Sequence, residues 1–197
     1  MIKVAVLVSG GGTNLQALID AQEVGAINPG VLSLVISNKP GVKALARAAR
    51  AGIPFEVIES AGVSQEEFEA KLSAVLDENG IQVIVLAGFL KVLSRDFVRK
   101  YDRRIINVHP SLIPSFCGDG FYGLKVHEAA LAKGVKITGA TVHYVNEITD
   151  GGEIILQKAV AICKNDTPET LQRRVMEQAE WKLLPRALKQ VCSEYDK

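Results

Sequence analysis

The sequence has 197 residues, of which 48% are hydrophobic, and 23 Lys and Arg nearly balance 22 Asp and Glu to give a formal charge of +1. This length suits one folded domain with a sizeable core, over residues 1–197. The small net charge argues against nucleic acid or a membrane surface as the main partner and favours small-molecule substrates. The three cysteines, Cys117, Cys163 and Cys192, lack CxxC spacing, which argues against a disulfide framework or a cysteine zinc site.

The N-terminal apolar run, Met1–Val8, is too short for a secretory signal peptide and has no small-residue cleavage site after it. Elsewhere, apolar segments fall short of the ~20 residues that span a bilayer. We therefore expect a cytoplasmic protein.

Five short runs rich in apolar and β-branched residues alternate with helix-like segments in the first half of the chain. They are Val4–Val8, Val31–Ser37, Pro54–Ile58, Val83–Leu86 and Arg104–Val108. Continuous apolar runs without polar alternation are typical of parallel strands covered by helices on both faces. The pattern predicts an α/β fold with a Rossmann-like, doubly wound, mainly parallel sheet.

The pattern changes after the fifth run, where the loop Ser115–Gly123 leads into a predicted helix at Leu124–Lys133. Two long apolar runs follow, Ile137–Val145 and Glu153–Ile162, joined by the turn-forming residues Thr149–Gly152. These runs predict an antiparallel pair that extends the sheet.

The chain is expected to close with a C-terminal helix. Pro168 suits its first position, with Asp166 or Thr167 as the N-cap. Pro185 is expected to kink or end this helix.

A glycine-rich loop, Ser9–Asn14, lies between the first strand and an amphipathic helix. Backbone N–H groups at such a helix start suit an anion. The loop is not a dinucleotide fingerprint, since Leu15 fills the third glycine position, and it has no P-loop lysine. The remaining functional interpretation is a monophosphate site in which Thr13 and Asn14 add side-chain donors; the structural alternative is a tight turn with an N-cap.

Asn107 and His109 lie two residues apart at the carboxyl end of the fifth strand, so both point to the same face. Ligands of open α/β sheets bind at these strand ends. An Asn amide can donate to a developing oxyanion and a His can move a proton, which suits acyl transfer. Asp150, in the turn between the late strands, is a candidate partner for the imidazole.

The sequence gives little support for other chemistries at this site. Ser111 follows the His-Pro pair but lacks the strand-to-helix elbow of a nucleophilic serine, which favours direct transfer without a covalent intermediate. His127 has no second His four residues on, and no metal is expected. His143 is expected to be structural.

Four groups of residues together resemble the folate-dependent formyltransferases: Asn107-x-His109-Pro110-Ser111-Leu112-x-Pro114, Ala87-Gly88-Phe89, Gly139-Ala140-Thr141-Val142-His143 and Thr149-Asp150-Gly151-Gly152. The opening residues Ser9–Gln16 resemble the branch of this family that acts on glycinamide ribonucleotide, and the likeness covers essentially the whole chain. The resemblance implies transfer of a formyl group from the co-substrate 10-formyltetrahydrofolate to the amine of glycinamide ribonucleotide, in de novo purine biosynthesis.

The resemblance also implies roles for individual residues. The implied catalytic residues are Asn107, His109 and Asp150. The residues implied to bind the ribonucleotide are Gly12, Thr13, Asn14 and Glu180. Those implied to bind the folate are Leu90, Lys91, Val92 and Leu93, together with Asn107 and Asp150.

The mechanism we expect is direct attack of the amine on the formyl carbon. Asn107 and a protonated His109 would stabilise the tetrahedral oxyanion, while Asp150 keeps His109 charged and helps relay the amine proton. Two alternatives are a hydrolase that releases formate from the same folate and a non-catalytic nucleotide-binding module.

The sequence departs from the family pattern at two places. Gln65 stands where some relatives carry an arginine near the folate tail. The loop Phe116–Gly123 is longer than in common family members, and we hypothesise that it is a mobile lid.

Overall fold

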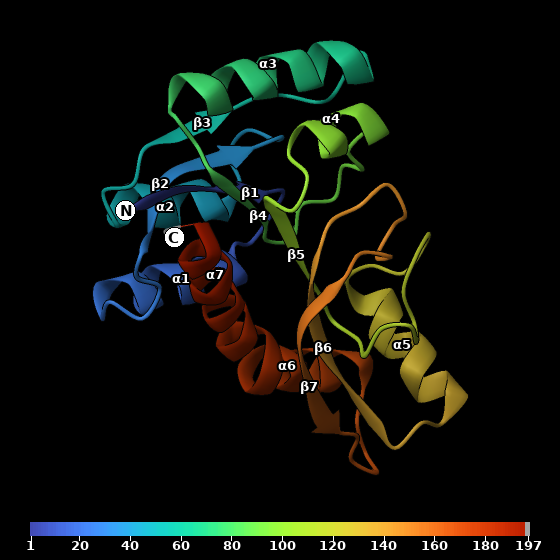
Figure 1. The fold of residues 1–197 in the computed structure, drawn as a ribbon. Helices are drawn as coiled ribbons and strands as arrows, with labels where there is room; N and C mark the ends of the chain where they lie inside the picture. Colours follow the sequence, from blue (N-terminus) through green and yellow to red (C-terminus); the bar gives the residue numbers. More distant parts are fainter. Residues whose placement is uncertain (196–197) are drawn as a thin grey trace.

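The computed structural model describes residues 1–195, in which a seven-stranded sheet is covered by helices on both faces (Figure 1). The strands are β1 (Ile2–Val8), β2 (Gly30–Ser37), β3 (Phe55–Val57), β4 (Val83–Leu86), β5 (Ile105–His109), β6 (Ile137–Tyr144) and β7 (Ile154–Ala161). The helices are α1 (Thr13–Glu23), α2 (Lys43–Arg50), α3 (Gln65–Glu78), α4 (Arg95–Lys100), α5 (Leu124–Lys133), α6 (Pro168–Val175), the π-helical turn η1 (Met176–Glu180) and α7 (Trp181–Tyr195).

The strand order is β3-β2-β1-β4-β5-β6-β7. The pairs among β1 to β5 are parallel, whereas β6 pairs antiparallel with both β5 and β7. The predicted fold class, a doubly wound and mainly parallel sheet with a late antiparallel extension and a C-terminal helix, is confirmed.

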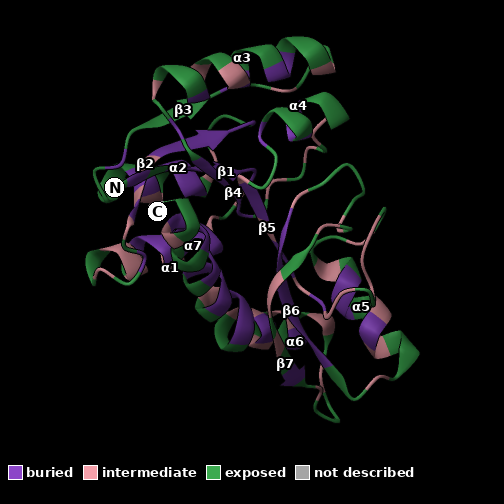
Figure 2. Cartoon of the chain, in the orientation of Figure 1, coloured by how far each residue is buried: buried purple, intermediate pink, exposed green. Residues whose placement is uncertain are grey.

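Strand alternation divides the apolar side chains of the sheet between two cores. In β1, Val4, Val6 and Val8 face the core under α1, α2 and α7, whereas Ala5 and Leu7 face the core under α3 and α4. All five are fully buried, as the continuous apolar run predicts for a central strand. Figure 2 shows the buried strands at the centre and exposed residues on the outer helix faces.

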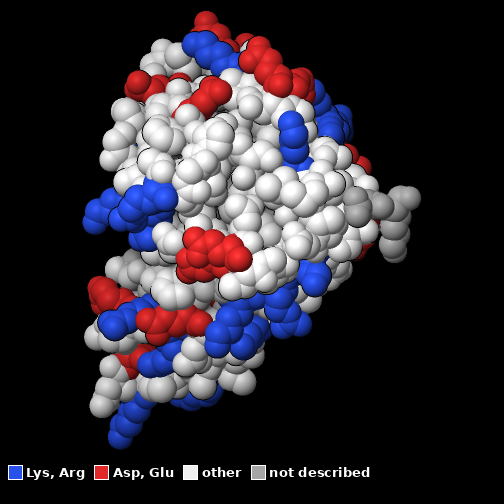
Figure 3. Space-filling view, turned by 90° about the vertical axis from the view of Figure 1, so that its left-hand side faces the viewer, with Lys and Arg blue, Asp and Glu red and all other residues white. Residues whose placement is uncertain are grey.

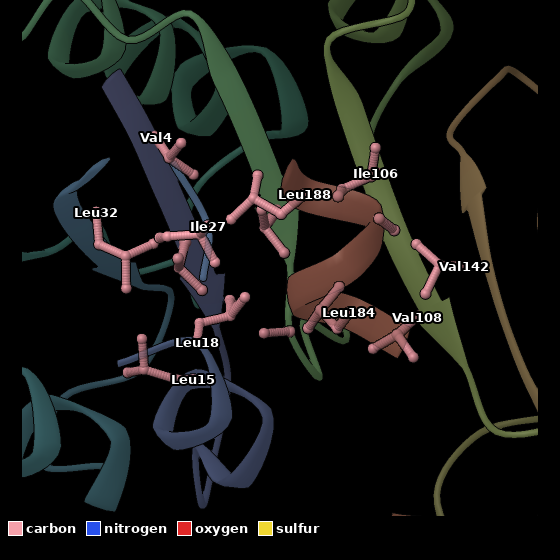
Figure 4. Close-up of a cluster of buried hydrophobic side chains, with 14 of the residues drawn as sticks. Val4, Leu15, Leu18, Ile27, Leu32, Ile106, Val108, Val142, Leu184 and Leu188 are labelled. Atoms are coloured by element: carbon pink, nitrogen blue, oxygen red, sulfur yellow. The ribbon is translucent and has the colours of Figure 1, made fainter. Parts of the chain in front are cut away.

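Helix α7 packs across the first face of the sheet (Figure 4). Its Leu184 and Leu188 share one apolar cluster with Ile106 and Val108 of β5 and with Leu18 of α1. Full burial of such a side chain contributes about 1.5–3 kcal/mol each. This packing holds the C-terminal helix against the strand that carries the candidate catalytic residues.

The C-terminal helical region differs from the sequence prediction at one point. Thr167 is the N-cap, and α6 begins at Pro168 as expected. Of the two outcomes expected at Pro185, a kink or an end of the helix, the end is wrong, because α7 continues through Pro185 to Tyr195. Proline has no N–H, so Pro185 removes one helical hydrogen bond. The helix departs from regular α-helical geometry just upstream, in the π-helical turn η1, where each hydrogen bond spans one residue more than in an α-helix.

Basic and acidic side chains are interspersed on the face shown in Figure 3, in keeping with the small net charge. Within residues 1–195, none of the helices is long and apolar enough to cross a bilayer.

Candidate active site

A cavity of about 640 Å³ lies at the carboxyl ends of β4 and β5. Its wall includes the segment after β4, the end of β5, the loop before α5 and the turn between β6 and β7. Its lining includes Asn14, Leu90, Lys91, Val92, Leu93, Asn107, His109, Asp150 and Glu180. The fold therefore brings most of the candidate residues from distant parts of the chain into one place.

Asn107 and His109 share a face of β5 because they alternate with Ile106 and Val108, which point into the opposite core. Asp150 reaches them from the β6–β7 turn, where it adopts a φ of 53°. Its Oδ2 lies 3.4 Å from the Nδ1 of His109. The predicted trio thus lies together at one end of the cavity.

His109 faces an acceptor at each ring nitrogen. Its Nε2 lies 2.9 Å from the carbonyl oxygen of Phe116, and since a carbonyl only accepts, Nε2 carries a hydrogen. Burial, with a smaller effect from His143, lowers the pKa of His109, and the Phe116 hydrogen bond and the Asp150 charge only partly offset this lowering. Asp150 thus raises the pKa of His109, as expected, but burial makes the imidazole harder to protonate than that of an ordinary histidine. Protonation of His109 in the reaction stays a prediction.

The Asp150 side chain, which is 9% exposed, is surrounded by donors and histidines. Burial raises the pKa of its carboxyl, but the neighbouring His143, the backbone N–H of Gly118 and the charge of His109 together outweigh burial, so that the pKa is lowered. The Gly118 N–H donates to Oδ2 over 2.9 Å. Asp150 is consequently a carboxylate at neutral pH, and it ties the loop before α5 to the β6–β7 turn.

His143, which the sequence analysis expected to be structural, lies in the cavity wall beside Asn107. Its Nδ1 donates to the Tyr144 carbonyl over 2.8 Å. With Nδ1 protonated, Nε2 accepts from the Asn107 Nδ2 over 3.2 Å. This bond orients the Asn107 amide, and Nε2 also lies 3.6 Å from Asp150 Oδ1.

His127 on α5 is another cavity residue that the sequence analysis did not assign to the site. Its side chain is fully buried, and neither ring nitrogen has a hydrogen-bond partner among the described residues. Burial, with a smaller effect from His109, lowers the pKa of His127 to about 4. Its ring is thus neutral at physiological pH.

The glycine-rich loop leads into α1 as predicted. Gly12 is the N-cap residue with φ 71°, a conformation that favours glycine, and α1 begins at Thr13. Of the three residues proposed to hold a phosphate, only Asn14 lines the cavity. The Thr13 hydroxyl instead faces the Met176 sulfur at 3.7 Å.

Glu180 is buried at the end of η1, where it closes the cavity beside α1. Its Oε2 accepts from the Asn14 Nδ2 over 2.7 Å. Burial raises its pKa to about 7, an effect that the Asn14 hydrogen bond only partly offsets. The burial of Glu180 excludes a solvated helix face for this residue.

The segment after β4 lines the cavity through Leu90, Lys91, Val92 and Leu93. Leu90 and Val92 are largely exposed, so apolar side chains remain open to a ligand. Gln65 lies behind this segment and donates to the Val92 carbonyl over 3.0 Å.

Among residues 1–195, no cluster of three or more His, Cys, Asp or Glu has the arrangement of a metal site. The thiols of Cys117, Cys163 and Cys192 are all free.

Residues 2–188 match the formyl transferase family. The chain belongs to this family, and the resemblance found in its motifs is confirmed. Within the family, the similar proteins include phosphoribosylglycinamide formyltransferases, the branch that the residues Ser9–Gln16 indicate.

Three relatives illustrate the similarity. The chain is 46% identical over 193 residues to the trifunctional purine biosynthetic protein adenosine-3 of Gallus gallus, covering 98% of this chain and 18% of that protein. It is 39% identical over 198 residues to the chloroplastic phosphoribosylglycinamide formyltransferase of Arabidopsis thaliana, covering 98% and 66%. The solved phosphoribosylglycinamide formyltransferase of Bacillus halodurans has a TM-score of 0.89 at 37% identity, covering 98% of this chain and 96% of that one. The chain thus spans less than a fifth of the trifunctional relative.

Proposed function

We propose that the chain transfers the formyl group of 10-formyltetrahydrofolate to the amine of glycinamide ribonucleotide, in de novo purine biosynthesis. The observation that carries the proposal is the meeting of Asn107, His109 and Asp150 with Asn14 and the segment Leu90–Leu93 in one cavity. An amide donor, an imidazole and a carboxylate are the groups that acyl transfer to an amine needs. Family relatives named for this activity match nearly the whole chain.

The two substrates would occupy different parts of the cavity. The N–H groups at the start of α1, at Gly12, Thr13 and Asn14, suit the ribonucleotide phosphate, and of these three residues Asn14 lines the cavity. Glu180 lies beside them and would contact the same substrate. The segment Leu90–Leu93 would hold the pterin, and the cavity volume falls in the range of small-molecule sites.

In the proposed reaction, Asn107 donates to the formyl oxygen as the amine nitrogen bonds to the formyl carbon. The amide thereby stabilises the tetrahedral oxyanion. The Phe116 carbonyl holds the Nε2 hydrogen of His109, so Nδ1 would take the proton from the amine and form an ion pair with the Asp150 carboxylate 3.4 Å away. That proton ends on the folate nitrogen as its bond to the formyl carbon breaks, with no covalent enzyme intermediate.

We also propose that residues 1–197 form one formyltransferase domain that acts on small molecules in the cytoplasm. One sheet with a core on each face links the described residues. Free thiols at Cys117, Cys163 and Cys192 are in keeping with a reducing compartment.

The test is absorbance-monitored turnover of 10-formyl-5,8-dideazafolate by the purified protein, with and without glycinamide ribonucleotide. Deformylation that depends on the ribonucleotide is the expected result. Equal loss of the formyl group without it would replace the transferase by a hydrolase, and no turnover by a folded protein would leave a binding module.

A further inference from the structure

The cavity segment Gly88–Ser94, between β4 and α4, is held in place without regular secondary structure. Its Leu90 and Val92 side chains are 56% and 69% exposed, so their own burial does not fix it. An irregular segment of this kind would lose conformational entropy when a ligand orders it. Its affinity for a ligand therefore depends on what orders it beforehand.

The first half of the cavity segment is bonded to the end of β1. The Ser9 hydroxyl accepts from the Leu90 N–H over 2.9 Å and donates to the Asn38 Oδ1 over 2.7 Å. Ser9 and Asn38 are both buried. The residue that opens the glycine-rich loop thus also anchors the opposite wall of the cavity.

The second half is bonded to Glu69, a carboxyl buried on α3. Glu69 Oε1 accepts from the Ser94 N–H over 2.6 Å, and Oε2 accepts from the Ser94 hydroxyl. Gln65 donates to Glu69 Oε1 over 2.5 Å and to the Val92 carbonyl over 3.0 Å. In its three contacts, with the Ser94 N–H, the Ser94 hydroxyl and the Gln65 amide, Glu69 is the acceptor, which satisfies a carboxyl that would otherwise be costly to bury.

The hydrogen bonds fall on residues 90, 92 and 94 and come from Ser9, Gln65 and Glu69, which lie outside the cavity lining. The backbone of the segment is therefore fixed by hydrogen bonds from residues outside the cavity lining, while its exposed side chains remain available at the cavity. A segment that these hydrogen bonds already order loses less conformational entropy when a ligand binds to it.

We propose that Glu69 is a positioning residue that fixes the cavity segment for the reduced folate, acting through Ser94 and Gln65, with Ser9 securing the other half. The inference rests on the proposed function, because it assigns the folate to this wall. Glu69 does not touch substrate, so its loss should weaken folate binding and leave ribonucleotide binding and the chemical step largely intact.

The experiment compares Glu69→Gln with Glu66→Gln, an exposed position of the same helix. Calorimetry gives the Kd of each variant for 10-formyl-5,8-dideazafolate and for glycinamide ribonucleotide, and steady-state turnover gives KM and kcat. Because a hydrogen bond to a charged group is involved, Glu69→Gln should raise the folate-analogue Kd about tenfold or more. The ribonucleotide Kd and kcat at saturation should stay near wild type, and Glu66→Gln should change neither affinity.

An unchanged folate-analogue Kd in folded Glu69→Gln would overturn the proposal, as would an equal loss of both affinities, which indicates a general structural effect. If Glu69→Gln does not fold, the test uses Ser9→Ala, which removes the hydroxyl that accepts from the Leu90 N–H. Weaker binding of the folate analogue is the expected result. An unchanged Kd for the analogue would overturn the proposal. Failure of the wild-type protein to bind the analogue would instead refute the proposed function.

Discussion

The burial of Glu180 makes the stability of the protein depend on pH in a specific window. Its carboxyl ionises near pH 4.5 in an unfolded chain and near pH 7 in the folded protein. Because folding raises the pKa of Glu180, its neutral carboxyl does not reduce the free energy of unfolding below pH 4.5. Between pH 4.5 and pH 7 the group ionises in the unfolded chain before it does so in the folded protein, and the free energy of unfolding falls progressively. The loss amounts to about 3 kcal/mol and is constant at higher pH.

Glu180→Gln removes this ionisation and keeps an oxygen that can accept from Asn14. Urea unfolding at a series of pH values gives the free energy of unfolding of wild type and of Glu180→Gln. Between pH 4.5 and about pH 8 the wild-type value should fall by about 3 kcal/mol relative to that of the variant. Glu177→Gln, at an exposed position of the same π-helical turn, is the matched control. A difference between wild type and Glu180→Gln that does not change with pH would refute the reasoning.

Three further predictions concern β5 with its neighbour Asp150 and the glycine-rich loop. Asn107→Ala should lower kcat about 10²- to 10³-fold by removing an oxyanion donor, with an unchanged urea midpoint; near-normal turnover would exclude the amide from the mechanism. Gly12→Ala should cost about 2–4 kcal/mol in urea unfolding, because φ is +71° and the new Cβ would lie 2.7 Å from a side chain of α2. Gly11→Ala, with nothing within 4 Å, is its control, and equal costs would contradict the argument. The acid limb of the pH profile of kcat/KM should lie below pH 6.5, because burial lowers the pKa of His109. Asp150→Asn should move this limb to still lower pH, since the Asp150 charge raises the pKa of His109. A limb above pH 6.5 would contradict the assignment of His109 as the group that takes the proton.

The strands could be predicted because a strand that is buried on both faces consists of consecutive apolar residues. Val83–Leu86 is a continuous apolar run, and the structure places β4 at these residues with all four buried. The path of the C-terminal helix could not be predicted in the same way. A proline marks a missing N–H, but the π-helical turn that precedes Pro185 depends on tertiary packing, which leaves no periodic pattern.

Asn107 and His109 were predictable because period-2 alternation and strand ends are local features. His143 was missed, although the antiparallel pairing of β5 and β6 places it directly opposite Asn107. The register of the late strands could have indicated this pair. Glu69 left no such sign, because on its own helix it is one polar residue among several and its partner Ser94 belongs to a distant loop.

The most direct test of the account follows the formyl carbon itself. The protein is incubated with 10-formyltetrahydrofolate labelled with ¹³C in the formyl group and with glycinamide ribonucleotide, and the products are identified by mass spectrometry. The account predicts that the label appears in the ribonucleotide, in an amount equal to the tetrahydrofolate formed. Label recovered as free formate would contradict direct transfer.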